Sequence, residues 1–494
     1  MTYTGYFRDR ASALSFRSDC WIGGAFVPAV SGLRFPSINP ATNAVLTELA
    51  RGDSADIDIA VRAARQAFTD GRWRAQAPVA RKEVLLRLAR LIRENTEELA
   101  LLDSLDMGKP IIAALDNDIP GAADVLQWTA EAVDKLYGEL APTDGNDLAI
   151  VSRVSLGVVG AVVPWNFPLN MAVWKTAPAL AAGNSVVLKP AEQSSLSALR
   201  LAELASEAGL PPGVLNVVPG YGHEAGQALG LHPDVDCLAF TGSTVVGKLF
   251  QVYAGQSNMK QVWLETGGKS PNIIFPDADI ARAAECAASG IFRNQGEVCS
   301  AASRLLVHRD VMDEVLERIV GHSHYFMPAD PLNPSTKMGA LVDRDHADRV
   351  ERFITEGKKA GRLLCGGNRV TIGNSDAFIE PTIFVDLDQN SELVQSEIFG
   401  PVLTVQVFDT EAEAVLMAND SIYGLAASVW TRDLRRALSM SRALVAGNVS
   451  VNSIDPLAPM VPFGGMKQSG IGRDLSLHAF SKYTALKATW IAGA

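Results

Sequence analysis

The stretch GVVGAVVPWNFPLNMAVWKTAPALAAGNSVVLK, residues 157–189, predicts a strand, a helix and a second strand in succession. Residues 157–163 and 184–189 are short apolar runs rich in valine, which suits buried strands. Residues 168–182 suit a helix that begins at a proline. Because strands separated by helices pair in parallel through right-handed crossovers, this stretch predicts an α/β fold with a parallel sheet.

The same alternation continues on both sides of a glycine pair at 267–268. Before this pair we expect further strands at 214–218, 237–241 and 261–264, and helices at 194–208, 222–229 and 243–253. A second series runs to about residue 465, with strands at 272–275 and 304–307 and helices at 279–292 and 310–322. The segment 56–137 is mostly helical, with helices at 57–68, 79–95 and 119–137. The chain therefore resolves into two α/β series behind a helical segment.

Length and composition limit the class of protein. The 494 residues exceed what one hydrophobic core supports, so two or three domains are expected. The net charge of −11 argues against nucleic acid or an anionic membrane as the main partner. The first ten residues lack the apolar segment of a signal peptide, and no apolar run is long enough to span a membrane. These features favour a soluble, cytoplasmic protein.

The cysteines give no sign of a disulfide framework or a metal site. Their number is odd and no pair has the CxxC spacing; they are Cys20, Cys237, Cys286, Cys299 and Cys365. A reducing compartment fits this usage, and no metal is expected. Cys237 and Cys286 suit buried, inert positions, because one begins an apolar strand and the other lies among alanines on a helix.

Two turns between a strand and a helix suit phosphate binding. The segment from Gly220 to Ala225, GYGHEA, fits the loose pattern GxGxx(G/A), and FTGS at 240–243 places Ser243 where it can cap the next helix. Each turn alone is equally consistent with an ordinary glycine-rich connection. Lys189 and Glu192 follow another strand, where Glu192 can accept hydrogen bonds from a ribose; a surface lysine and a helix-start acid are the alternatives.

Three residues suit covalent chemistry. Cys299 follows a helix in a glycine-containing loop that can expose the sulfur and surround it with backbone donors. Glu265 ends a strand beside the glycine pair and can act as a general base. Asn166 ends the first strand of the series and can donate an amide N–H to an oxyanion. A buried cysteine, a solvated loop acid and a rigid proline turn are the respective alternatives.

Taken together, these segments resemble the aldehyde dehydrogenase superfamily. The matching motifs occur in the family's order and cover most of the chain: PWNFP (164–168), KPAE (189–192), FTGS (240–243), ETGGKSPN (265–272), NQGEVCSA (294–301), EIFGP (397–401) and PFGGMKQSG (462–470). The resemblance implies oxidation of an aldehyde to a carboxylate with a dinucleotide cofactor.

The resemblance implies a catalytic role for four residues. Cys299 is expected to add to the aldehyde, with Asn166 and the backbone N–H of Cys299 holding the oxyanion. Glu265 is expected to activate the water that hydrolyses the thioester, and Lys189 to bind the cofactor. A thiolate is needed at neutral pH, so we expect neighbouring donors or dipoles to lower the pKa of Cys299.

The resemblance also implies the cofactor and its contacts. The expected contacts are Val163, Pro164, Trp165, Asn166, Lys189, Ala191, Glu192, Gly222, Gly226, Phe240, Thr241, Gly242, Ser243, Val246, Glu265, Thr266, Gly267, Glu397 and Phe399. Glu192 should repel a 2′-phosphate, which favours NAD, while NADP stays possible. The family commonly has leucine where this chain has Thr266, which puts little in doubt because the position needs only its backbone.

The family's architecture implies three parts and an oligomer. We expect a Rossmann-like dinucleotide-binding domain over residues 1–137 and 157–267 and a catalytic α/β domain over 268–478. A small β oligomerisation extension would use 138–156 and 479–494, with the tail at 483–491 as an edge strand for a partner subunit. Homodimers or homotetramers would follow.

The nearest resemblance is to the gamma-glutamyl-gamma-aminobutyraldehyde dehydrogenases of putrescine catabolism. The shared stretches are DIPGAA (118–123), LYGEL (136–140), GHEAGQAL (222–229), NDSIYGLAASVWTRDL (419–434) and KQSGIGRDLSLHAF (467–480). The resemblance places the tunnel for the aldehyde at Asp116, Asp118, Trp174, Phe292, Asp455 and Phe463. Asp116 and Asp118 suit an aminoaldehyde there, or are ordinary helix-start acids.

Three alternative functions stay open at this stage. The loop at 452–459 carries one acid and is otherwise apolar, which favours a broader range of aldehydes, including betaine or aliphatic ones. An enzyme that transfers the acyl group to CoA would use the same cysteine but would not need Glu265. A catalytically silent binding protein would not need the four catalytic residues.

Overall fold

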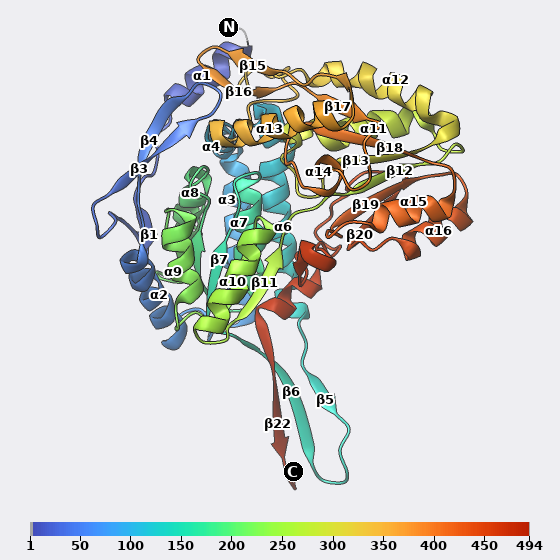
Figure 1. Ribbon diagram of the computed structural model, residues 1–494. Coiled ribbons are helices and arrows are strands. Elements are labelled where there is room, and N and C mark those ends of the chain that lie inside the picture. Colours follow the sequence, from blue (N-terminus) through green and yellow to red (C-terminus); the bar gives the residue numbers. More distant parts are fainter. Residues whose placement is uncertain (1–2, 494) are drawn as a thin grey trace.

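Two sheets form the body of the protein. The computed structural model describes residues 3–493 (Figure 1). The first sheet has the strand order β2 (Ala25–Val27), β1 (Cys20–Ile22), β9 (Leu215–Val217), β8 (Ser185–Lys189), β7 (Val158–Val162), β10 (Cys237–Thr241), β11 (Gln261–Glu265) and β21 (Gly470–Ile471). Its five central strands are parallel, and the strands at both edges are antiparallel. The predicted parallel sheet is confirmed.

The second sheet is built in the same way. Its order is β14 (Arg362–Cys365), β17 (Thr382–Val385), β18 (Val402–Phe408), β13 (Arg304–His308), β12 (Pro271–Ile274), β19 (Ala426–Trp430) and β20 (Asn448–Val451). All pairs are parallel except β14 with β17. The chain passes from the first sheet to the second between Glu265 and Pro271, and β21 returns to the first sheet. Strand β21 belongs to the first sheet although it falls inside the segment 268–478, which was expected to form the catalytic domain. The domain boundaries stay a prediction.

Helices cover both sheets. Those before β12 are α1 (Tyr3–Ser12), α2 (Ser54–Thr69), α3 (Pro78–Glu94), α4 (Thr96–Met107), α5 (Ile111–Ala113), α6 (Ile119–Ala132), α7 (Pro168–Ala181), α8 (Leu196–Glu207), α9 (Gln227–Leu231) and α10 (Thr244–Gln256). Those after it are α11 (Ile280–Phe292), α12 (Met312–Ser323), α13 (Arg344–Ala360), α14 (Glu392–Gln395), α15 (Glu411–Asn419) and α16 (Leu434–Ala443). No helix within residues 3–493 is long and apolar enough to cross a membrane.

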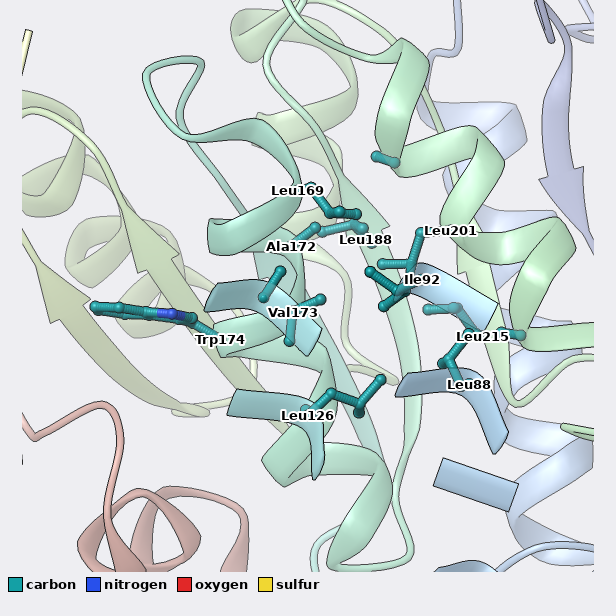
Figure 2. Close-up of a cluster of buried hydrophobic side chains, with 14 of the residues drawn as sticks. Leu88, Ile92, Leu126, Leu169, Ala172, Val173, Trp174, Leu188, Leu201 and Leu215 are labelled. Atoms are coloured by element: carbon teal, nitrogen blue, oxygen red, sulfur yellow. The ribbon is translucent and has the colours of Figure 1, made fainter. Parts of the chain in front are cut away.

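The largest core cluster lies between the helical segment and the first sheet. Leucine, isoleucine and valine side chains from α3, α6, α7 and α8 meet those of β8 and β9 (Figure 2). In the figure Trp174, at the side of α7, points away from this cluster. Burial of these side chains fixes α7 against the sheet, and therefore fixes the turn that precedes α7 at the carboxyl end of β7.

A three-stranded extension projects from the body. It contains β5 (Glu139–Ala141), β6 (Leu148–Ser155) and β22 (Thr484–Ile491), and the chain ends at its tip (Figure 1). The tail pairs with β6 of its own chain over eight residues, from Thr484 opposite Ser155 to Ile491 opposite Leu148. Strand β22 lies at the edge of this sheet, so its addition to a sheet of a partner subunit stays a prediction. Two short hairpins complete the chain, β3 (Arg34–Asn39) with β4 (Ala44–Ala50) and β15 (Arg369–Ile372) with β16 (Ser375–Ile379).

Candidate active site

The loop that carries Cys299 leaves α11 through an unusual backbone turn. Asn294 and Gln295 have φ values of 48° and 59°, and Gly296 has 73°, so three successive residues are left-handed. Such a conformation costs free energy in non-glycine residues and persists where surrounding contacts hold it. The turn brings Cys299 back against the core of the first sheet, where its side chain is half-buried.

The side chain of Asn166 holds this loop from the opposite sheet. Its amide nitrogen donates to the carbonyl of Glu297 at 2.9 Å, while the amide of Asn294 donates to the carbonyl of Asn166 at 3.1 Å. An amide nitrogen carries two N–H groups, so one remains available to an oxygen beside Cys299. The two segments that sequence analysis singled out separately are therefore joined by reciprocal hydrogen bonds.

Glu265 is a buried acid at the end of β11. Neither of its carboxyl oxygens has a hydrogen-bond partner within residues 3–493. Burial, followed by the nearby Asp474 carboxylate, raises its pKa to about 8, and three cations oppose that shift. Gly464 lies against it, since a Cβ at that position would be 2.7 Å from its Oε1. A carboxyl with this pKa and no internal partner can exchange a proton with a water or a thiol near neutral pH.

Sequence analysis missed the charged cluster behind Glu265. Lys175 on α7 and Lys482 near the tail both donate to the buried carboxylate of Asp474. The signal available in the sequence was the lone lysine in the apolar run MAVWKTAPAL. Lys175 and Lys482 stabilise ionised Glu265, while Asp474 opposes its ionisation.

The pKa of the Cys299 thiol is raised, not lowered. Burial is the largest cause, followed by the carboxylates of Asp455, Glu397 and Glu265; only the N–H of Ser300 opposes them. The expectation of a lowered pKa is therefore wrong for the protein alone, because the sulfur is buried and the charged groups nearest to it are acids. At neutral pH the resting residue is a thiol, and its activation requires a base.

The residues expected to bind adenosine meet at the carboxyl ends of the central strands. Lys189 ends β8, is buried, and donates from Nζ to Glu192 at 2.9 Å. Burial opposes ionisation of Glu192, but the Lys189 ammonium beside it lowers the pKa of the carboxyl, and the backbone N–H of Gly222 in the glycine turn acts in the same direction. A Cβ on Gly222 or Gly226 would meet nothing within 4 Å, so both face open space. These residues fit a ribose beside an open phosphate site.

The second turn expected to bind phosphate, residues 240–243, leads into α10. Ser243 caps the helix by accepting the N–H of Val246 at 3.3 Å, and the preceding Gly242 packs on the Phe240 ring. The hydroxyl of Thr241 is buried without a partner within residues 3–493. Free N–H groups in the first turn of a helix of this length favour an anion. Val163, Pro164 and Ala191 belong to the turns after β7 and β8 on the same side.

Residues of the second sheet close the crevice from the other side. Glu397 accepts the N–H of Gly268 at 2.9 Å, and burial raises its pKa to about 7. A Cβ on Gly267 would lie only 2.1 Å from its Oε2, so Gly267 leaves room for this carboxyl. The ring of Phe399 lies 5.3 Å from that of Trp165. His346, which sequence analysis missed, contacts both rings and bonds to the carbonyl of Phe399 at 2.6 Å.

The sequence of the chain matches a known protein family over most of its length. The profile of the aldehyde dehydrogenase family matches residues 26–489. The chain is 53% identical to the NADP/NAD-dependent aldehyde dehydrogenase PuuC of Escherichia coli, covering 99% of this chain and 98% of PuuC. The chain belongs to the aldehyde dehydrogenase family. Members are NAD(P)-dependent oxidoreductases, and this chain is an enzyme of that kind.

Solved structures of the family have the same fold. The gamma-glutamyl-gamma-aminobutyraldehyde dehydrogenase of Burkholderia cenocepacia matches with a TM-score of 0.98 at 52% identity, over 100% of both chains. The indole-3-acetaldehyde dehydrogenase AldA of P. syringae, in complex with NAD⁺ and IAA, matches with a TM-score of 0.98 at 51% identity, over 99% of both chains. The predicted aldehyde dehydrogenase-like fold is confirmed.

The departure from the family pattern at Thr266 has a local explanation. Its hydroxyl donates to the carbonyl of Gln468 at 2.6 Å, and its N–H donates to the carbonyl of Ser469. Thr266 therefore ties the segment after Glu265 to the PFGGMKQSG motif. A leucine at this position would keep the backbone bond and lose the side-chain bond.

Two of the expected tunnel residues are buried among other side chains. Phe292 is fully buried in the core of the second sheet's domain and packs on Phe326, so it does not face an entrance. The next residue, Arg293, reaches the loop of the site instead, where it bonds to Asp455. Asp118 is buried in an ion pair with Lys109 and cannot serve as a free acid. Asp116, on the same turn, is exposed.

The other tunnel residues do cluster. The rings of Trp174 and Phe463 make an edge-to-face contact at 5.5 Å, and Trp174 also borders a small hollow with Pro459. Asp455 lies on the loop after β20 and is bonded to Ser300, the neighbour of Cys299, at 2.7 Å. These tunnel residues therefore place an apolar wall and one acid beside the loop of Cys299.

Proposed function

We propose that this family member oxidises an aminoaldehyde of the gamma-glutamyl-gamma-aminobutyraldehyde type to its carboxylate, with NAD as the preferred cofactor and NADP accepted. The substrate is supported by the similarity to the Burkholderia cenocepacia enzyme of that name. The cofactor preference is supported by Glu192, whose carboxylate beside Lys189 would repel a 2′-phosphate.

In this proposal Cys299 is the nucleophile and Glu265 the base. The thiol of Cys299 gives its proton to water, and the sulfur bonds to the aldehyde carbon as the carbon–oxygen double bond becomes single. The oxygen that becomes anionic is held by Asn166 and the N–H of Cys299. Bound NAD⁺ supplies the acceptor for the hydride that leaves this carbon. The product of that transfer is a thioester on Cys299.

Hydrolysis completes the reaction. Glu265 takes a proton from water, the oxygen bonds to the acyl carbon, and the carbon–sulfur bond breaks to release the carboxylic acid and the thiolate. The observation that carries this proposal is the buried, unpartnered carboxyl of Glu265, which lies close enough to Cys299 to raise the pKa of its thiol. This arrangement favours hydrolysis over transfer of the acyl group to CoA.

We infer that the enzyme is a homo-oligomer in the cytoplasm. Large apolar side chains are exposed on the extension, including Leu486 and Trp490, and on α10, including Val245 and Val252. Apolar patches of this kind on a folded chain favour burial against a second copy. The cytoplasm is supported by the chemistry of Cys299, which must stay a reduced thiol.

A substrate panel tests the proposal. We expect the purified enzyme to form NADH from gamma-glutamyl-gamma-aminobutyraldehyde without CoA, with a higher kcat/KM than from 3-aminopropanal, betaine aldehyde or propanal. The same panel with NADP gives the cofactor preference. A strict requirement for CoA, or a higher kcat/KM for propanal, would contradict the proposal.

A further inference from the structure

An ion pair lies beside the proposed nucleophile. Arg293, the first residue after α11, donates from Nη2 to Oδ2 of Asp455 at 2.7 Å, and the hydroxyl of Ser300 donates to the same oxygen at 2.7 Å. Asp455 is also the charged group that contributes most to the raised pKa of the Cys299 thiol, after burial. The pair therefore occupies the surroundings of the sulfur, where an aldehyde must enter.

The loop that carries Asp455 is fixed on the end of α11. Ile454 packs on Gly290, where a Cβ would come within 3.0 Å of its side chain, and Asp455 has a left-handed backbone with φ of 46°. The carboxylate of Asp455 is only 6% exposed, whereas the side chain of Arg293 is 48% exposed. The Asp455 carboxylate is therefore buried, and the Arg293 guanidinium faces solvent.

The two partners differ in the hydrogen bonds that they can still make. Asp455 already accepts two hydrogen bonds and is nearly inaccessible. Arg293 carries five N–H donors, of which Asp455 takes one within residues 3–493, and a guanidinium binds a carboxylate through two parallel bonds. The unused N–H donors of Arg293 therefore suit an anion. An ammonium group would be repelled by the exposed guanidinium before it reached Asp455.

We propose that Arg293 selects aldehydes that carry a carboxylate remote from the reacting carbonyl, and disfavours aldehydes that carry only a cation. This inference rests on the proposed function and narrows the range of aldehydes that the enzyme accepts. Gamma-glutamyl-gamma-aminobutyraldehyde carries such a carboxylate, whereas 3-aminopropanal carries only an ammonium group. The ion pair with Asp455 orients the guanidinium.

Matched substrates test the inference within one enzyme preparation. The probes are ω-oxo acids of four to six carbons and their neutral amides, with butanal as the unsubstituted reference. We expect the wild-type enzyme to prefer each acid that reaches Arg293 over its amide. Arg293→Met should lower kcat/KM for that acid by about 10- to 100-fold, mainly through KM, as for the loss of a charge-assisted hydrogen bond. The acid-to-amide ratio should then approach one.

Two further variants make the result specific. Arg293→Lys keeps the charge but not the paired donors, so its acid-to-amide ratio should lie between those of the wild type and Arg293→Met. Arg309→Met removes an exposed arginine that pairs with Asp409 away from the site, and it should change no ratio. A ratio within one preparation does not depend on the fraction of folded protein.

The outcomes separate this inference from the proposed function. An acid-to-amide ratio that Arg293→Met leaves unchanged, or a wild-type preference for 3-aminopropanal over every ω-oxo acid, would overturn the inference. If the ratio falls but gamma-glutamyl-gamma-aminobutyraldehyde is a poor substrate, the inference stands and the proposed substrate is wrong.

Discussion

At the scale of the residue, the surroundings of Glu265 determine its charge. Burial and the Asp474 carboxylate favour the protonated acid, and Lys175 and Lys482 favour the carboxylate. The balance puts its pKa at about 8. A general base is most useful when its pKa lies near the working pH, so the cluster suits Glu265 for moving protons near neutrality.

The pH dependence of turnover tests this assignment. Because only ionised Glu265 can accept a proton from water, kcat limited by hydrolysis should rise with pH and level off above about 8. Steady-state NADH production between pH 6 and 10 measures the curve. A wild-type kcat that is flat from pH 6 to 8, with hydrolysis shown to be rate-limiting, would contradict the role of Glu265.

Sequence analysis could select these residues but not their protonation. Glu265 stood out because it ends a strand beside two glycines, and Cys299 because it follows a helix in a glycine-containing loop. Burial is the largest cause of both pKa shifts. The charges that modify them, Asp474 and Lys482 for Glu265 and Asp455 for Cys299, lie more than 150 residues away along the chain. No local pattern states which distant charges will meet in space.

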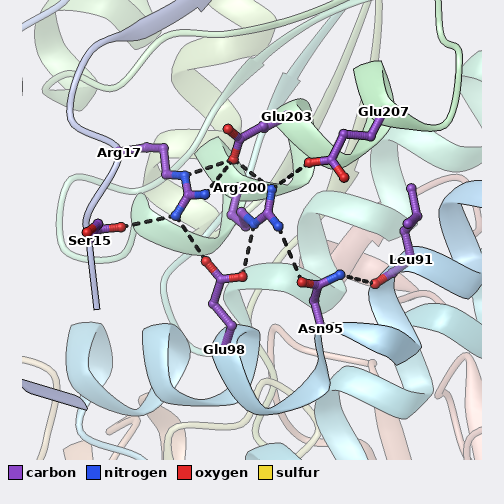
Figure 3. Close-up of polar contacts among 8 residues, drawn as sticks. All are labelled: Ser15, Arg17, Leu91, Asn95, Glu98, Arg200, Glu203 and Glu207. Atoms are coloured by element: carbon purple, nitrogen blue, oxygen red, sulfur yellow. Dashed lines mark hydrogen bonds and ion pairs between the residues drawn. The ribbon is translucent and has the colours of Figure 1, made fainter. Parts of the chain in front are cut away.

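At the scale of the element, one arginine network joins the segment between α1 and β1, here called the N-terminal arm, to helices α4 and α8. Arg200 on α8 bonds to Glu98 on α4 and to Glu203 and Glu207 on its own helix (Figure 3). Arg17 of the N-terminal arm shares two of these acids, Glu98 and Glu203. The acids are thereby held between two guanidinium groups, of which that of Arg200 is the more buried.

Substitutions at the two arginines should differ in cost. Arg200→Met removes a mostly buried guanidinium from two partly buried acids, Glu98 and Glu203, and should destabilise by about 2 kcal/mol. Arg17→Met removes more exposed pairs and should cost less than about 1 kcal/mol. Midpoints of urea unfolding, followed by circular dichroism, measure both. Equal midpoints for the two variants would contradict the difference in burial.

The elements themselves were largely predictable. The strand at 237–241 matches β10 residue for residue, and the helix at 168–182 exceeds α7 by one residue. The partners of an element were not predictable in the same way. The pairing of β22 with β6 was not predicted, and Phe292, which the resemblance placed in the tunnel, is buried in a core against Phe326, because periodicity locates an element without naming what it packs on.

At the scale of the whole molecule, buried acids link folding to pH. Burial is the main cause that raises the pKa of Asp103 to about 6, of Asp106 and Glu397 to about 7, and of Glu265 to about 8. An acid whose folded pKa lies above its unfolded value holds more protons in the native state, so stability falls as the pH rises through that window. His346, with a pKa lowered to about 4, acts in the opposite sense.

The protein without cofactor should therefore be more stable at pH 5 than at pH 7. Four acids outweigh one histidine in this range, and the buried Lys269, with a pKa lowered to about 7, contributes only above it. The loss should be at least ~2 kcal/mol, since one shifted group contributes ~1.4 kcal/mol per pH unit. Thermal unfolding midpoints at a fixed scan rate measure it, and Asp106→Asn should flatten the slope. A midpoint that rises from pH 5 to 7 would contradict the predicted protonation.

The central claim is that Cys299 forms a thioester which Glu265 helps to hydrolyse. The most direct measurement is mass spectrometry of Glu265→Gln after mixing with NAD⁺ and propanal. The account predicts a burst of about one NADH per subunit, followed by a stall, with one propanoyl group on the peptide that contains Cys299. Steady turnover without acylated Cys299, or a propanoyl group on another residue, would contradict it.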